Sequence, residues 1–412
     1  MAVLMNPPSD LKILEAENQA LRCKIDELTH HLESQKQDAG HFSLLSLTEI
    51  ILENSTAVLF RRLAAVDPKK RKMVYVSPNI SCFGYRAKDF LEGKIMFRDI
   101  IYPEDSERTL KEISEYVDQG LETYTQSYRI VTGDGEVRWV EDRTSIFVEQ
   151  TTGLRYHQGI VIDIHEQKKA LQLAAEVQKS LLPEAAPIID GLDVAGSTIS
   201  CDEVGGDYFD YLSNTVIGND NLSIIIGDIT GHGVDAALFM ASARAFLRMR
   251  ASQPGTVEDI VMAMNRHLTR DMEKTGRFMT MFYLVIERSN SRLRWVRAGH
   301  DPALLYDPNT DRFVELSGPG IALGVDEEYT YQQQQTEQLL RDQVIVLTTD
   351  GIFEACNQNG EMFGKQRLKS VVRRDHSKSS QAILDNIMLE HARFTYGVDR
   401  EDDLTLVIVK IV

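Results

Sequence analysis

The sequence is poor in cysteine and contains no long apolar run. Its 4 cysteines among 412 residues are Cys23, Cys82, Cys201 and Cys356, which form no CxxC motif and no evident disulfide framework. No apolar stretch reaches the length of a membrane span, and the start, MAVLMNPPSD, lacks the basic and apolar regions of a secretory signal. These absences predict a protein of the reducing cytoplasm with no membrane association.

Basic residues are fewer than acidic residues. The chain has 45 Lys and Arg against 62 Asp and Glu, for a formal net charge of −17, which disfavours binding to nucleic acid or to an anionic membrane surface. A hydrophobic content of 43% with 26% charged residues is typical of a soluble globular protein. The length exceeds that of one ordinary core, so we expect two or three domains. The segments described below make the predicted fold class a multidomain α/β protein.

Residues 10–36 carry a heptad pattern. One heptad position holds Leu11, Asn18, Ile25 and Leu32, and another, three residues later, holds Leu14, Leu21, Leu28 and Gln35. Ile and Leu at these positions with one Asn favour a parallel two-stranded coiled coil in fixed register. We therefore predict a coiled-coil helix in residues 1–40 and a homodimer; the alternative is an amphipathic helix folded back on its own chain.

Residues 41–163 have the outline of an α+β sensor module. A helix is expected at Thr48–Leu59, and three strand-like runs follow at Thr123–Val131, Val137–Phe147 and Arg155–Asp163. Four segments occur in order, VYVSPNISCFGY, IYPEDSERTL, YRIVTGDGEVRWVEDRTSIF and GIVIDIHEQKKA. Together they resemble a PAS domain with its C-terminal PAC segment, which implies a PAS fold and dimerisation through this domain as well as through the coiled coil.

The ligand of this PAS-like module is unknown from the sequence. Asn79 and Cys82 do not reproduce the Asn-Cys-Arg-Phe-Leu-Gln type motif of flavin-binding PAS photosensors, which argues against a photoreactive cysteine. His157 and His165 are candidate haem ligands, but an isolated His on a strand or at a helix start is more often a satisfied polar residue.

A helix is predicted over residues 164–182, IHEQKKALQLAAEVQKSLL, because the segment has no Gly or Pro and many strong helix formers. Pro183 ends it. We assign residues 164–186 to a helical linker, which can transmit a rotation or register change as a unit, whereas a Gly/Ser-rich linker cannot.

Four acidic turns lie at the ends of predicted strands in the C-terminal part. VGGDYFDY and NLSIIIGD contain Asp207 and Asp228, and VIVLTTDG and DDLTLVIVKIV contain Asp350 and Asp402. Glycines beside several of these acids let the backbone bend sharply and leave the carboxylate open to a ligand. Because carboxylates are costly to gather without a matching cation, this pattern predicts a site for a hard divalent metal.

Seven segments of the C-terminal part carry a more specific resemblance. They are VGGDYFD, GDITGHGVDAALFMA, FMTMFYLVIE, RAGHDPALLY, GIALGV, TTDGIFEACNQNGEMFG and DDLTLVIV, in that order. They resemble the PPM (PP2C-like) protein phosphatases of the bacterial SpoIIE/RsbU type over essentially residues 170–412. The resemblance implies an α-β-β-α sandwich in residues 187–412 with two Mn²⁺ or Mg²⁺ ions at the sheet edge. The metal ligands that it implies are Asp207, Asp228, Asp350, Asp402 and the backbone carbonyl of Ile229.

The chemistry of phosphoester hydrolysis suits such a site. A phosphoserine ester is dianionic near neutral pH, and two hard cations about 4 Å apart can bind it and deprotonate a bridging water. The four mapped acids are therefore the predicted catalytic residues, acting through water that the metals activate. Glu203, Asp210 and Asp403 are candidates to hold metal-bound water, and Asp403 stands where eukaryotic relatives have Asn. The Arg that precedes the first acid in those relatives is missing, so the group that orients the phosphate is unassigned.

Two histidines lie near the acidic turns. His232 is expected to brace the Gly231–Gly233 turn, and His300 is either a general acid or a loop brace, of which the brace is favoured.

The combined reading is a metal-dependent serine/threonine phosphatase controlled by a PAS sensor. The family's substrate class is a phosphorylated anti-anti-sigma (STAS-domain) protein in a partner-switching pathway. One alternative is a PAS-linked cyclic-dinucleotide synthase, because Gly205-Gly206-Asp207-Tyr208-Phe209 echoes the GGDEF signature. Another is a non-catalytic scaffold that binds a phosphoprotein.

Overall fold

The computed structural model describes residues 55–64, 72–213, 221–336 and 339–412. These residues fall into two compact units, one ending at Lys168 and the other beginning at Lys169. The predicted coiled coil at 10–36 lies outside the described residues, so it stays a prediction. Among the described residues, no helix has the length and apolar character needed to cross a bilayer.

The N-terminal unit is built on one antiparallel five-stranded sheet. The strands are β1 (Ala57–Leu63), β2 (Met73–Val76), β3 (Thr123–Val131), β4 (Val137–Val148) and β5 (Arg155–Asp163), in the order β2-β1-β5-β4-β3. Between β2 and β3 lie η2 (Pro78–Phe83), α3 (Ala87–Leu91), η3 (Phe97–Ile100) and α4 (Pro103–Asp118). Alternate residues of the strands, such as Tyr128, Ile130, Val140 and Val161, pack against Phe83 and Phe90 to form the core.

The predicted strands of this unit are confirmed, but the helix predicted at Thr48–Leu59 is wrong at its end. Residues 57–59 already belong to β1. Val58 and Phe60 are buried while their neighbours are less so, which is the alternation of a strand. The strand pairs with β2 on one side and β5 on the other, so tertiary pairing outweighs the local helical pattern.

The helix α5 (His165–Leu181) follows the PAS-like sheet directly. Its first residue donates its backbone N–H to Asp163 at 2.9 Å, and Lys168 lies 5.8 Å above the Trp139 ring. No residue of α5 is fully buried. The helix predicted from sequence composition at 164–182 is confirmed to within one residue at each end.

The C-terminal unit contains two five-stranded antiparallel sheets, ordered β13-β10-β9-β8-β7 and β12-β11-β14-β15-β6. The strands of the first sheet are β7 (Tyr208–Ser213), β8 (Asn221–Ile229), β9 (Met279–Glu287), β10 (Arg292–Ala298) and β13 (Gln334–Thr336). Those of the second are β6 (Leu192–Ile199), β11 (Ala303–Asp307), β12 (Arg312–Leu316), β14 (Val344–Thr348) and β15 (Leu404–Ile411).

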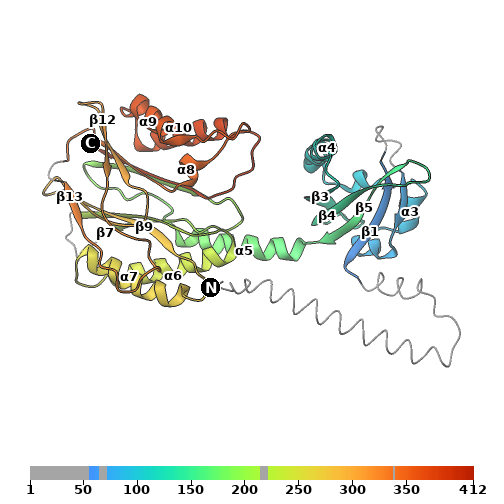
Figure 1. Ribbon diagram of the computed structural model, residues 1–412, viewed down its shortest axis with the longest axis horizontal. Coiled ribbons are helices and arrows are strands. Elements are labelled where there is room, and N and C mark those ends of the chain that lie inside the picture. Colours follow the sequence, from blue (N-terminus) through green and yellow to red (C-terminus); the bar gives the residue numbers. More distant parts are fainter. Residues whose placement is uncertain (1–54, 65–71, 214–220, 337–338) are drawn as a thin grey trace, which may run out of the picture. The chain divides into compact units, whose positions relative to one another are not determined.

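Helices cover the outer face of each sheet (Figure 1). The helices α6 (Val234–Ala251) and α7 (Val257–Met272) pack on the first sheet, and α9 (Gly364–Asp375) and α10 (Ser380–Phe394) pack on the second. A third apolar cluster, including Phe282, Leu284, Ile345 and Val407, fills the space between the two sheets. The layers are therefore helices, sheet, sheet and helices.

The helix α7 shows how the sequence fixes these layers. Thr256 caps it: its hydroxyl accepts the Asp259 N–H at 3.3 Å, and Asp259 accepts the Thr256 N–H at 2.9 Å. Such a capping box contributes about 1 kcal/mol. Val261, Met264 and Leu268 follow at helical spacing and are fully buried, so this face of the helix belongs to the core.

Candidate metal centre

Each sheet of the C-terminal unit supplies two of the four predicted acids. Asp207 precedes β7 and Asp228 is the penultimate residue of β8, both in the first sheet. Asp350 lies between β14 and the short α8 (Gly351–Glu354), and Asp402 lies two residues before β15, both in the second sheet. The four acids thus lie at strand ends, as the sequence predicts.

Hydrogen bonds of Asp207 join the two sheets at this edge. Its Oδ2 accepts the hydroxyl of Thr349 at 2.8 Å and the hydroxyl of Thr405 at 2.5 Å. Thr349 immediately precedes Asp350, and Thr405 follows Asp402 by three residues. Segments that are almost 200 residues apart in sequence therefore meet around one buried carboxylate.

Asp403 holds the loop that carries Asp207. Its Oδ2 accepts the backbone N–H groups of Gly206 at 2.7 Å and Asp207 at 3.2 Å, and its Oδ1 accepts the N–H of Cys201 at 2.8 Å. The side chain is 3% exposed. Asp403 therefore positions the first acidic loop through its backbone.

The predicted carbonyl ligand also faces this loop. A Cβ atom placed on Gly206 would lie 2.7 Å from the carbonyl oxygen of Ile229, closer than real Cβ contacts allow. Glycine at 206 is therefore required for the two backbone segments to approach, and the Ile229 carbonyl lies beside the residue that precedes Asp207.

The four carboxyl groups share a poorly solvated, negatively charged environment. Burial, followed by repulsion from Asp350 and Asp402, raises the pKa of Asp228 from 3.8 to about 7. Burial and the charge of Asp228 hold the pKa of Asp207 well above its usual range. Burial is also the main cause of the raised pKa values of Asp350 and Asp402. Each shift reports a carboxylate that lacks a compensating positive charge.

The residues present fit a cation. Oδ1 of Asp207 is buried and has no hydrogen-bond partner, so one oxygen of the central acid is held by two threonines and the other is left for a ligand. The carboxylates of the four acids do not form a tight cluster. Within the described chain, the one group of three His, Cys, Asp or Glu side chains whose ligand atoms lie within 4.8 Å of one another is Cys201, Asp202 and His232. Four mutually repelling acids at one edge are a donor set that hard divalent cations can stabilise.

Asp210 is not oriented toward this edge, which corrects the expectation that it reaches a metal or its waters. Its carboxylate forms a two-pronged ion pair with Arg248 of α6, with both N–O distances at 2.7 Å. It also accepts the Tyr208 hydroxyl at 2.6 Å. Alternation along β7 points Asp210 into the layer between sheet and helix, away from the end of the strand.

The remaining predicted residues have defined places. Glu203 is half-exposed in the loop before Gly205. His300 is buried between Thr280, whose hydroxyl lies 2.8 Å from Nδ1, and the Thr348 carbonyl, 3.1 Å from Nε2. With both ring nitrogens engaged, His300 braces the loop. Nδ1 of His232 lies 2.6 Å from the Asp202 carboxylate, so this histidine links two loops.

Three contributors to the site were missed by sequence reasoning. Thr349 and Thr405 were visible beside the acids in TTDG and DDLTL, but threonines are frequent in strands and carry no distinguishing signal. Gln178 of α5 binds the backbone of Gly205 twice: its Nε2 donates to the carbonyl at 2.7 Å, and its Oε1 accepts the N–H at 3.1 Å. Nothing in the sequence links a helix glutamine to a loop 27 residues away.

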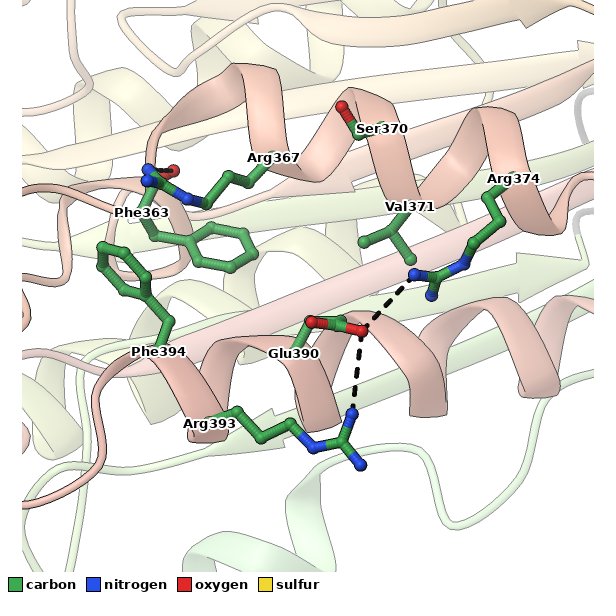
Figure 2. Close-up of a pocket in the computed structure, with 8 residues that line it drawn as sticks. All are labelled: Phe363, Arg367, Ser370, Val371, Arg374, Glu390, Arg393 and Phe394. Atoms are coloured by element: carbon green, nitrogen blue, oxygen red, sulfur yellow. Dashed lines mark hydrogen bonds and ion pairs between the residues drawn. The ribbon is translucent and has the colours of Figure 1, made fainter.

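A surface groove lies between α9 and α10 (Figure 2). It has a volume of about 490 Å³ and is lined by Arg and Phe side chains, none of them from the acidic turns. Glu390 pairs with Arg374 at 3.4 Å and with Arg393 at 3.8 Å. One acid among the lining residues therefore faces three arginines, and Arg367 and Arg374 also pair with Glu361 and Asp375 outside the groove.

The N-terminal unit contains a cavity of about 200 Å³ bordered by α3, η3 and α4. His157 is buried, and its Nδ1 lies 2.8 Å from the Tyr124 hydroxyl. This contact supports the reading of His157 as a satisfied polar residue. His165 begins α5.

Comparison with known families and proteins gives two domain matches. Residues 218–412 match the family described as Stage II sporulation protein E (SpoIIE), and residues 73–161 match the PAS fold. The phosphoserine phosphatase RsbU of Bacillus subtilis is 26% identical over 260 residues, which cover 63% of this chain and 75% of RsbU. The phosphoserine phosphatase RsbP of the same organism is 29% identical over 192 residues, which cover 45% of this chain and 46% of RsbP.

Among solved structures, the SiaA-PP2C domain of Pseudomonas aeruginosa aligns with a TM-score of 0.53 and 20% identity. The alignment covers 60% of this chain and the whole of that domain. At this identity the likeness concerns the fold, which is that of PP2C-like phosphatases.

Proposed function

We propose that this chain, which joins a PAS domain to a SpoIIE-type serine/threonine phosphatase domain, hydrolyses phosphoserine or phosphothreonine with two divalent metal ions. The proposed ligands are Asp207, Asp228, Asp350, Asp402 and the backbone carbonyl of Ile229. The observation that carries the proposal is the bridging position of Asp207, which is bonded to both flanking threonines of the second sheet while its other oxygen is buried without a partner.

The protein's part in the reaction is to hold four carboxylates at fixed positions. When bound, Mn²⁺ or Mg²⁺ ions supply the positive charge that binds a phosphate dianion and lowers the pKa of a water nucleophile. The threonine hydroxyls fix one oxygen of Asp207 and leave the other toward the site. Asp403 fixes the loop at three backbone N–H groups. The reaction requires no covalent intermediate on the enzyme.

Both alternatives from the sequence have less support. The Gly205-Gly206-Asp207 turn resembles part of a cyclase signature, but it leads into a strand of a PP2C-like sandwich. Asp207 accepts hydrogen bonds from Thr349, which follows β14, and from Thr405 in β15. A scaffold that only binds phosphoproteins would not need all four acids, and all four are retained.

For the substrate, we propose a phosphorylated STAS-domain anti-anti-sigma protein in a partner-switching pathway. The support is the resemblance to the SpoIIE/RsbU family together with two relatives that are phosphoserine phosphatases.

Control by the PAS domain is proposed to act through α5. One end of this helix contacts the PAS sheet, where Lys168 lies over the Trp139 ring. Near its other end, Gln178 binds both backbone groups of Gly205, two residues before Asp207. A rotation of the helix would therefore act on the first acidic loop.

Dimerisation is proposed to involve α5 as well. Leu173 and Val177 are 62% and 57% exposed and lie one helical turn apart, with the exposed Ala170 and Ala174 on the same face. This apolar stripe is suited to pairing with a second copy, in addition to the coiled coil predicted for residues 1–40.

The deciding experiment is dephosphorylation of phosphorylated STAS-domain proteins from the same genome by the full chain, with and without Mn²⁺. We expect phosphate release that requires Mn²⁺ and is abolished by Asp228→Ala. Activity of Asp228→Ala equal to that of the wild type would refute the metal centre. Accumulation of cyclic di-GMP on incubation with GTP would instead support the cyclase.

A further inference from the structure

Three side chains with metal-binding atoms gather beside the carboxylate centre. Sγ of Cys201, a carboxylate oxygen of Asp202 and a ring nitrogen of His232 all lie within 4.8 Å of one another. They come from two loops: residues 200–206, which lead to the first acid, and residues 230–233, which follow the second. None of the three is among the proposed ligands of the two hard ions.

Both loops are held in place by contacts independent of this group. The N–H of Cys201 donates to Asp403, and the carbonyl of Ser200 accepts from Arg400 at 3.1 Å. In the second loop, the Thr230 N–H donates to the Phe278 carbonyl at 3.1 Å, and the Thr230 carbonyl accepts from Arg277. The backbone of both loops is therefore set before any ion binds.

The donor set differs in kind from that of the carboxylate centre. Thiolate and imidazole are soft or borderline ligands that favour Zn²⁺, whereas Mg²⁺ and Mn²⁺ favour oxygen. Three protein ligands with a fourth position open are also the composition of many non-structural zinc sites. We propose that Cys201, Asp202 and His232 form a separate site for Zn²⁺ or a similar thiophilic divalent cation.

The geometry requires a small adjustment to take the ion. Oδ2 of Asp202 and Nδ1 of His232 are 2.6 Å apart, whereas two such ligands of a tetrahedral zinc ion are separated by about 3.4 Å. Their side chains are 45% and 64% exposed, so a rotamer shift of less than about 1 Å can separate them.

The thiol of Cys201 is held in its neutral form. Burial and the neighbouring Asp403 raise its pKa to about 12, which makes it a poor nucleophile. Zinc binding would form the S–Zn bond and release the thiol proton to solvent.

The test uses the full chain, stripped of metal and then saturated with Mg²⁺ so that the carboxylate centre is supplied. Co²⁺ is titrated as a spectroscopic substitute, with the thiolate-to-cobalt charge-transfer band as readout, and Zn²⁺ is added to displace it. We expect one equivalent of this band in the wild type and in Cys356→Ser, the control at another half-buried free cysteine. Cys201→Ser should lose the band. His232→Ala and Asp202→Asn should weaken Co²⁺ binding at least about 10-fold, because loss of a partner that only supports a ligand already costs about that much.

Two outcomes would overturn the site. A band of equal strength in Cys201→Ser would place the ion elsewhere. Unchanged affinity in both His232→Ala and Asp202→Asn would mean that only the thiol binds the ion, beside a hydrogen-bonded Asp–His pair. Displacement in the wild type provides a measurement that needs no variant: Zn²⁺ should abolish the cobalt band, and a band that survives excess Zn²⁺ would contradict the site. None of these readouts depends on phosphatase activity, so the proposed function and this site can fail separately.

Discussion

Asp207 has different surroundings at its two carboxylate oxygens. Oδ2 accepts two threonine hydroxyls, whereas Oδ1 is buried with no partner. A buried unsatisfied oxygen on an acid costs about 1–3 kcal/mol or more, so the folded protein is destabilised here unless a cation is bound. The arrangement favours metal binding because folding has already placed the ligands and removed water from the buried oxygen, so binding does not have to supply the free energy for either step.

The same reasoning gives a prediction for Asp228. Its folded-state pKa of about 7 lies above its ordinary value of 3.8, so the metal-free folded state loses stability as the pH rises from about 4 to 7, and the full loss is present above pH 7. Asp228→Asn should therefore raise the unfolding free energy of the metal-free protein at pH 8, by on the order of 1–3 kcal/mol. It should also lower Mn²⁺-dependent phosphatase activity by at least about 100-fold.

Thermal unfolding in EDTA and in Mn²⁺ measures the first effect. In EDTA the variant should have a higher Tm than the wild type. Replacing EDTA by Mn²⁺ should raise the Tm of the wild type more than that of the variant. Asp385→Asn, on the exposed surface of α10, is the matched control and should change neither value. A variant less stable than the wild type in EDTA would contradict the repulsion.

His300 should change the stability with pH in the opposite direction to Asp228. Burial lowers its pKa from 6.5 to about 4, so it is neutral in the folded state and takes up a proton on unfolding below pH 6.5. Its contribution to stability is present above pH 6.5 and is lost as the pH falls toward 4, by up to about 3 kcal/mol. Urea unfolding of the wild type and of His300→Gln at pH 7, 6 and 5 should show a steeper decline for the wild type. Parallel declines would mean that the histidine is protonated in the folded state.

At the level of single residues, the position of the four acids at strand ends was easier to predict from the sequence than the contacts that their neighbours form. The four acids could be found because each stands beside glycine or a second acid at the end of an apolar run. Asp210 was misjudged because its nearness in sequence to Asp207 says nothing about which face of β7 it occupies. Its partner Arg248 is 38 residues away on another layer, and such a pairing is fixed only by packing.

Among the elements, the helix α5 has the most consequence for function. Its Gln178 forms two hydrogen bonds with Gly205, and each contributes about 0.5–1.5 kcal/mol. Gln178→Ala should loosen the loop that carries Asp207 and weaken Mn²⁺ activation several-fold, seen as a higher Mn²⁺ concentration for half-maximal activity. Gln172→Ala is a matched control, because Gln172 is an exposed glutamine of the same helix.

A rise in the Mn²⁺ requirement of Gln178→Ala alone would support the contact as a positioning device. Equal behaviour of the two variants would show that α5 does not act on the loop through Gln178. Helicity measured by circular dichroism should be the same in both, since alanine favours a helix.

Elements were predictable where the pattern is local. The strands at Thr123–Val131 and Arg155–Asp163 are found at the predicted residues, and the helix predicted at 164–182 is found at His165–Leu181. The helix α9, Gly364–Asp375, was missed because five of its twelve residues are Lys or Arg, and a largely charged segment shows little apolar periodicity. The strand β6 was missed because its Asp, Gly, Ser and Thr residues dilute the apolar alternation; its pairing along the full length of β15 stabilises it.

For the whole molecule, the proposal is that a change in the PAS domain reaches the phosphatase as a rotation of α5. The order of the domains was predictable because the motifs occur in sequence order, but no motif reports how the two units communicate. A continuous helix gives that communication an angular dependence: each residue adds about 100° of rotation and 1.5 Å of length.

Insertions into α5 between Lys168 and Gln178 test this dependence. One added alanine after Ala170 rotates everything before it by about 100° relative to Gln178, whereas a duplication of residues 171–177 adds seven residues and returns to within about 20° of the original phase. We expect the single insertion to change the phosphatase rate several-fold and the seven-residue insertion to leave it near the wild-type value, although the longer insertion separates the units more. Rotation is the mechanism that predicts a larger change for one added residue than for seven. A larger change in the seven-residue variant, or no change in either variant, would therefore exclude transmission by rotation.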